Sequence, residues 1–198
     1  MNIVVDIETT DNCPTTAILS IGAAALNSDG AVVSTFYTPV SLDNCLRMGM
    51  TVGADTMAWW MEQEDKARAV WSEAKEKNGA PSLREALCLF NSWLNEQCEF
   101  SYRVMWGNGS DFDNVILANA CKLVGMDLPW PFWNNRCFRT LKNEWGRYVP
   151  QPEFIGVKHN AKDDAVHEAV WLGRILQAQR AAMVVAESTD VISKAEKV

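Results

Sequence analysis

Two carboxylates lie one residue apart near the start of the chain, in the run DIETT. Asp6 and Glu8 follow the apolar residues Ile3-Val4-Val5, and this pattern predicts a strand over residues 3–8. Successive side chains of a strand point to opposite faces, so Asp6 and Glu8 share one face while Ile7 lies on the other. Two neighbouring acids repel each other. Their placement on one face is physically reasonable if the strand ends in water or if a cation lies between the carboxylates.

Two further pairs of acids lie where a strand ends or a helix begins. Asp111 and Asp113 follow a glycine-rich turn, and Asp163 and Asp164 stand in the first turn of a predicted helix. Acids are common at such positions, because they cap helices and interact favourably with the helix dipole. Each pair is therefore weak evidence of chemistry when it is taken alone.

One of the two histidines of the chain precedes the last pair of acids. His159 stands on the loop that leads into the helix, five positions before Asp164. A base and a metal ligand would then point into the same crevice. The other histidine, His167, lies inside the predicted helix and is interpreted as an ordinary helix residue.

Composition and charge limit the class of protein. The chain has 198 residues, of which 48% are hydrophobic and 22% charged, as in ordinary globular proteins. We expect one domain over residues 1–186 and a frayed tail over 187–198. The net charge of -7 argues against a broad basic surface along a nucleic-acid backbone, but it allows a small site that grips one strand end.

Other bulk features point to a cytoplasmic protein without a membrane partner. The longest nearly apolar stretch, 17–26, is shorter than the ~20 residues of a spanning helix. The N-terminus has no basic region, and Asp6 comes too early for the apolar core of a signal peptide. The six cysteines form no CxxC pair, so we expect reduced, mostly buried thiols.

Periodicity and turn residues predict an α/β domain with a mixed five-stranded sheet flanked by helices. The functional crevice of such a sheet tends to lie at the carboxyl ends of its parallel strands, where Glu8 and Asn108 stand. The expected strands are 3–8, 17–26 and 31–40, which form an antiparallel meander, then 102–106 and 133–137. The expected helices are 55–76, 82–97 with the capping box Ser82–Glu85, one through Val115 to Gly125, a short one from 139, and 160–182.

The motifs occur in an order that resembles a known superfamily. DIETT at 6–10, GNGSDFDNVIL at 107–117 and HNAKDDA at 159–165 resemble the three exonuclease motifs of the histidine-containing branch of the DEDD superfamily (DEDDh, DnaQ-like). The segments DTMAWWMEQ at 55–63 and NRCFRTL at 135–141 are similar to the exonuclease VIII-like group of phages and bacteria, which includes a mycobacterial exoribonuclease. The resemblance spans roughly residues 1–176.

The resemblance implies a ribonuclease H-like fold and a metal-dependent 3′-5′ exonuclease that releases nucleoside 5′-monophosphates from single-stranded DNA or RNA. It implies that two divalent cations, Mg²⁺ or Mn²⁺, are held by Asp6, Glu8, Asp113 and Asp164, and that His159 deprotonates the attacking water. The chain departs from the group at Cys137, where an acid is common, and in the additional acids Asp111 and Asp163. These two acids are expected to add negative potential or to substitute in part for their neighbours.

Six further residues are candidates for binding the substrate: Thr9, Trp59, Trp60, Gln63, Asn108 and Arg139. Trp59 and Trp60 point about 100° apart on a helix, so we expect one in the core and weigh the other equally as core or as a stacking surface for the terminal base. Arg139 is equally consistent with a phosphate contact and with an ordinary surface arginine. Two other functions stay open, a phosphodiesterase limited to very short oligonucleotides and a catalytically idle nucleic-acid or protein-binding module on the same fold.

Overall fold

The centre of the molecule is a mixed sheet of five strands. The computed structural model describes residues 1–195, with side chains described as far as residue 186. The sheet has the order β3-β2-β1-β4-β5, in which β1 pairs antiparallel with β2 and β2 with β3, whereas β1–β4 and β4–β5 are parallel. The predicted meander and the mixed sheet are thereby confirmed. The strands are β1 Asn2–Thr9, β2 Ile18–Leu26, β3 Val32–Pro39, β4 Val104–Gly107 and β5 Asn135–Cys137.

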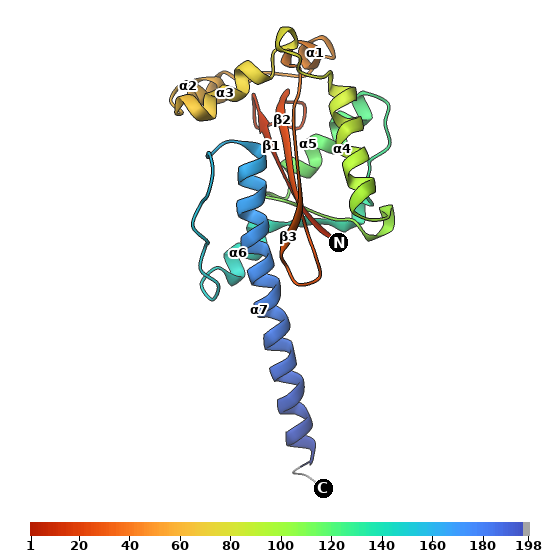
Figure 1. The fold of residues 1–198 in the computed structure, drawn as a ribbon, viewed down its shortest axis with the longest axis vertical. Helices are drawn as coiled ribbons and strands as arrows, with labels where there is room; N and C mark the ends of the chain where they lie inside the picture. Colours follow the sequence, from red (N-terminus) through yellow and green to blue (C-terminus); the bar gives the residue numbers. More distant parts are fainter. Residues whose placement is uncertain (196–198) are drawn as a thin grey trace.

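Helices cover both faces of this sheet (Figure 1). Helix α4 starts with the predicted capping box, in which Ser82 N donates to the Glu85 carboxylate at 2.8 Å and Ser82 Oγ accepts from Glu85 N at 3.3 Å. The longest helix, α7, lies across the sheet and then projects beyond it. The helices are α1 Leu42–Arg47, α2 Ala54–Met61, α3 Asp65–Glu73, α4 Leu83–Gln97, α5 Asp113–Leu123, α6 Phe138–Trp145 and α7 Ala161–Ala195.

Strand β1 separates two apolar cores. Ile3, Val5 and Ile7 are buried in a cluster with residues of α4 and α5, such as Phe90 and Leu117. On the other face, a second cluster joins β1 and β2 to α6 and α7; it contains Val4, Ala24, Leu26, Trp106, Phe138, Ala169, Leu172 and Ile175. The chain is therefore a three-layer α/β/α domain.

Two glycine contacts let α7 approach the sheet closely. A Cβ on Gly22 of β2 would lie 2.1 Å from the carbonyl carbon of Ala161, and one on Gly173 would lie 2.0 Å from the carbonyl oxygen of Gly30. Real Cβ atoms do not come so near to backbone atoms, so neither position has room for a side chain. The first contact fixes the start of α7 beside the middle of the sheet.

Several predicted boundaries are wrong. The single helix expected over 55–76 is two helices, because the chain turns at 62–64 so that Trp60 of α2 and Val70 of α3 both pack in one small core with Leu19. Helix α1 was not predicted.

The end of the last helix also differs from the expectation. Helix α7 continues to Ala195 rather than ending near residue 182, and residues 196–198 of the expected tail lie outside the described residues. Within the described part of the chain, no helix combines the length and apolarity needed to cross a membrane.

Candidate active site

The two acids of the DIETT run lie on the face of β1 that is turned toward α7. Their side chains share this face with Val4, which packs in the core under α6 and α7, whereas Ile7 is buried on the opposite face. Glu8 is 8% exposed and Asp6 is partly buried. Beyond Val4, toward the carboxyl end of β1, acidic side chains therefore replace the apolar ones.

Asp113 reaches the same place from the start of α5. Its carboxylate accepts hydrogen bonds from two backbone N–H groups, that of Ile7 at 3.3 Å and that of Asn108 at 2.8 Å. These bonds tie the acid to the ends of the two parallel strands β1 and β4. Gly107 allows the approach, because a Cβ there would lie 3.0 Å from the Asp113 side chain.

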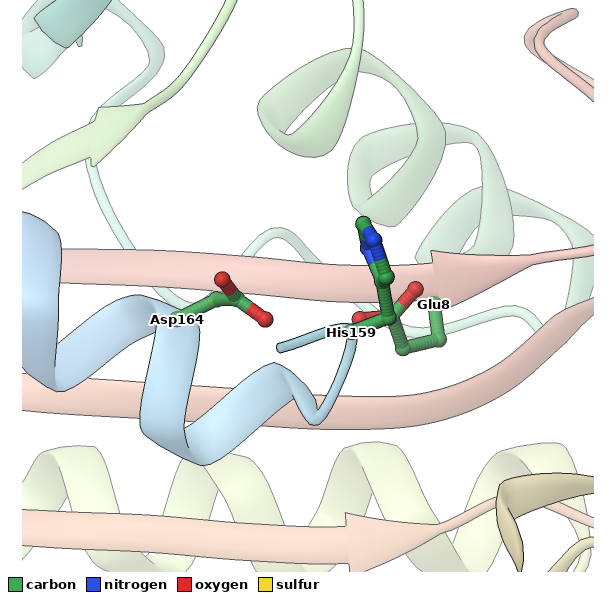
Figure 2. A group of neighbouring side chains, drawn as sticks. All are labelled: Glu8, His159 and Asp164. Carbon is green, nitrogen blue, oxygen red and sulfur yellow. The ribbon is translucent and has the colours of Figure 1, made fainter. Parts of the chain in front are cut away.

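The start of α7 supplies the remaining predicted residues. Glu8, His159 and Asp164 each place one potential ligand atom within 4.8 Å of the other two, and their side chains converge in Figure 2. His159 has a left-handed backbone with φ 63°, an uncommon conformation that often accompanies functional sites. Its ring packs edge-on against Trp59, with centroids 4.9 Å apart.

A cavity of about 350 Å³ opens over these side chains. All four predicted acids and His159 line it, as do Thr9, Trp59, Trp60, Asn108 and Arg139. Gln63 does not line this cavity. It lines a neighbouring one, and its side-chain amide donates to the Trp59 carbonyl at the end of α2. The cavity is also lined by residues that the sequence did not single out: Ile7, Asp11, Asn12, Thr56, Phe112 and Glu168.

The two neighbouring tryptophans have different surroundings. Trp60 is 2% exposed, and its indole N–H donates to the Thr9 carbonyl at 2.9 Å, which braces the end of β1. Trp59 is 40% exposed and borders the cavity beside His159. The Thr9 hydroxyl donates to the Asp11 carbonyl at 2.6 Å and so has a partner within the protein.

The additional acids and Cys137 take part in local structure. The Asp163 carboxylate accepts from Val157 N at 2.9 Å and thus shapes the loop before His159, while Asp111 is exposed and outside the cavity. The thiol of Cys137 accepts from Thr140 N and caps the first turn of α6. In this structure, Asp113 and Asp164 are the members of their pairs that face the cavity.

Burial and mutual repulsion disfavour the charged forms of these acids. Burial raises the pKa of Glu8 to about 8 and those of Asp113 and Asp164 to about 6, and neighbouring acids contribute for Glu8 and Asp164. For Asp6, burial and then Glu8 raise the pKa well above its ordinary value. Burial followed by the nearby Lys158 lowers the pKa of His159, so its imidazole is neutral at pH 7.

The donor set fits divalent cations. Hard carboxylate oxygens from three parts of the chain meet in one cavity, and Asp164 Oδ2 is buried without a hydrogen-bond partner among the described residues. Positive charge at this place would offset the repulsion that raises the acids' pKa values. Asp6, Glu8, Asp113 and Asp164 are the residues that would hold such ions.

The fold and this site define a class of protein. The chain resembles the crystal structure of cell-death related nuclease 4 (TM-score 0.62, 15% identity, 89% of this chain and 64% of that one). It also resembles the nuclease domain of 3′hExo, a DEDDh family member bound to rAMP (0.60, 18%, 89% and 92%), and E. coli exonuclease I in complex with a dA16 oligonucleotide (0.57, 14%, 89% and 40%). The chain thus spans less than two thirds of the first and third proteins, and the likeness establishes the ribonuclease H-like fold of DEDDh exonucleases.

A match between the sequence and a protein-family model identifies the family. The Rv2179c-like 3′-5′ exoribonuclease domain matches residues 1–176, and the chain belongs to that family. A search of curated proteins gives no significant match. The resemblance seen in the motifs is confirmed: residues 1–176 form a domain of the Rv2179c-like 3′-5′ exoribonuclease family.

Proposed function

We propose that the protein removes nucleoside 5′-monophosphates one at a time from the 3′ end of single-stranded RNA or DNA, with two divalent cations, Mg²⁺ or Mn²⁺. The observation that carries this proposal is the meeting of Glu8, His159 and Asp164 within 4.8 Å in a cavity that Asp6 and Asp113 also line. A neutral base beside a group of acids that fits cations is what phosphodiester hydrolysis needs.

The four acids and His159 would have different roles in the hydrolysis. The cations, held by Asp6, Glu8, Asp113 and Asp164, would supply Lewis-acid stabilisation of the attacking and leaving oxygens. His159 is neutral at pH 7 and accepts the proton of the attacking water. The new bond joins the water oxygen to phosphorus, and the bond from phosphorus to the 3′ oxygen of the preceding nucleotide breaks. The products are a nucleoside 5′-monophosphate and a strand with a free 3′-hydroxyl.

The aromatic and polar lining of the cavity suits one terminal nucleotide. Trp59 is exposed at the rim, where a base stacks without sequence preference. Arg139 lines the cavity and would meet a phosphate, while Asn108 and Thr9 border the acids and would contact the sugar end. The DEDDh neighbour bound to rAMP and the exonuclease I complex with dA16 support this use of the cavity.

A second candidate is a phosphodiesterase restricted to very short oligonucleotides. Among the residues that line the cavity, Arg139 is the one Lys or Arg, and the net charge is -7. A long strand gains little from such a surface, because its binding depends on many phosphate contacts. The two candidates share the chemistry and differ in the length of the substrate.

The experiment is the incubation of 5′-labelled single strands of RNA and DNA, matched in sequence, with the protein and Mg²⁺ or Mn²⁺. We expect a descending ladder that needs the metal, together with nucleoside 5′-monophosphates, and no ladder with the Asp113→Asn variant. Cleavage confined to strands of a few nucleotides would select the second candidate. Absence of products on every strand, or full activity of Asp113→Asn, would overturn both.

A further inference from the structure

One buried acid of the cavity has no part in the four-acid motif. Glu168 lies on α7 one turn after Asp164, so the two side chains share a face of the helix. It is 7% exposed and lines the cavity together with Asp6 and Asp113. Its Oε2 atom is buried and has no hydrogen-bond partner among the described residues.

The charges around Glu168 are those of the cation site. Asp113 and Asp164 repel its carboxylate, and it in turn repels Asp6. Two cations, Lys142 and Arg139, attract it, yet neither forms an ion pair with it in the described structure, where the Lys142 ammonium lies 5.4 Å from the ring centre of Phe138 instead.

An arrangement of this kind is unfavourable in the protein alone. A buried carboxylate without a hydrogen bond or a paired charge destabilises a fold, and three like charges nearby add to that cost. Nothing in the packing requires an acid there, because α7 attaches to the sheet through the apolar residues Ala169, Leu172 and Ile175 and through the two glycine contacts. A bound cation would remove the penalty.

We propose that Glu168 is a fifth carboxylate of the cation site, which helps to hold the divalent ions on the side of Asp113. This inference rests on the proposed function, since it assumes that the four acids of the motif bind the ions. It extends the site by one turn of α7 and assigns the buried oxygen a ligand, either directly or through a water molecule. Lys142 and Arg139, which attract the Glu168 carboxylate, would then offset part of the additional negative charge.

The test measures the binding of Mn²⁺ to the purified protein without substrate, by calorimetry or by the electron paramagnetic resonance signal of free Mn²⁺. Glu168→Gln keeps the size of the side chain and removes its charge. We expect it to weaken Mn²⁺ binding about tenfold or more, as the loss of a supporting metal contact does elsewhere. The control is Asp111→Asn, an exposed acid beside the motif, which should bind Mn²⁺ as the wild type does. Glu168→Asp, which retains the charge on a shorter side chain, should lie between them.

The outcomes separate this inference from the proposed function. Equal Mn²⁺ affinity in the wild type and Glu168→Gln would overturn the inference and leave the proposed function standing. A wild type that binds no Mn²⁺ would overturn both. Thermal unfolding without metal shows whether each variant is folded, and Glu168→Gln should unfold at the same temperature as the wild type or higher, because it removes a repelling charge.

Discussion

The two faces of strand β1 differ in what they contribute to the molecule. Toward α4 and α5, the strand presents Ile3, Val5 and Ile7, which are at most 4% exposed. Toward α7, it presents Val4 and then the acids Asp6 and Glu8. Each buried aliphatic side chain stabilises the fold by about 1.5–3 kcal/mol, whereas the acids raise one another's pKa values and destabilise it when they are charged.

The difference shows how a small domain can tolerate an acidic site in its interior. One face of the strand is apolar from Ile3 to Ile7, and the other carries a single apolar side chain, Val4, which packs in the core under α6 and α7. The acids are confined to the carboxyl end of β1, beside the first turns of α7. Packing and chemistry therefore depend on alternate residues of the same eight-residue strand.

Replacing neighbouring residues of β1 should separate the two contributions. Asp6→Asn is expected to lower the rate of hydrolysis about a thousandfold or more, since a metal site supplies several kcal/mol to the transition state, without loss of stability in metal-free buffer. Ile7→Ala should lower the free energy of unfolding by about 2–5 kcal/mol. Rate measurements and denaturant unfolding of both variants check this, and an Asp6→Asn protein that unfolds as easily as Ile7→Ala would contradict the division.

Replacing His159, which lines the cavity beside Asp6 and Glu8, tests its assignment as the general base. His159→Ala should reduce the rate at neutral pH about a hundredfold or more and remove the fall in rate toward acid pH that protonation of this imidazole causes. His167→Ala is the matched control, because that ring does not line the cavity over the four acids and contacts Gln151 and Phe154. The measurement is the rate of hydrolysis of both variants as a function of pH. An unchanged profile in His159→Ala would show that another residue is the base.

Gly22 tests the attachment of α7 to the sheet. Gly22→Ala would place a methyl group 2.1 Å from the Ala161 carbonyl carbon, so α7 must shift and carry Asp164 with it. We expect the free energy of unfolding to fall by about 1–3 kcal/mol, along with weaker Mn²⁺ binding. Gly109→Ala adds a methyl group at an ordinary contact distance of 3.4 Å and should leave stability unchanged. Equal stabilities of the two variants would show that the fold does not need the close contact between Gly22 and the Ala161 backbone.

The smallest effect is expected at the rim of the cavity. Trp59→Ala should weaken substrate binding by about 1–3 kcal/mol, seen as a higher KM, while kcat changes less. Trp60→Ala, by contrast, removes a buried indole and its hydrogen bond to Thr9 and should lower stability. Steady-state kinetics beside thermal unfolding distinguish the two, and an unchanged KM in Trp59→Ala would exclude base stacking there.

Features that depend on local sequence were predictable. The alternation in β1 placed Asp6 and Glu8 on one face, because neighbouring residues encode it. The three motifs indicated the exonuclease family, because each is a short run of the sequence that can be recognised without the fold. The capping box at Ser82 was found for the same reason.

Features that depend on packing between distant segments of the chain could not be predicted from the sequence. The turn at 62–64 exists because Trp60 and Val70 share a core with Leu19, which lies more than forty residues away in the chain. Glu168 reads in the sequence as an ordinary helix acid, and its four-residue spacing from Asp164 was the one available signal. Its burial becomes visible when α7 is placed against β1.

The most direct test of the cation site is the thermal unfolding of the wild-type protein between about pH 5 and pH 8, with and without Mn²⁺. The raised pKa values, about 6 for Asp113 and Asp164 and about 8 for Glu8, mean that the folded protein holds protons that the unfolded chain has released. Without metal, the unfolding temperature should therefore fall as the pH rises through this range, and Mn²⁺ should raise it most at the upper end. A metal-free unfolding temperature that stays level or rises, with no shift on addition of Mn²⁺, would contradict the assignment of these acids to a cation site.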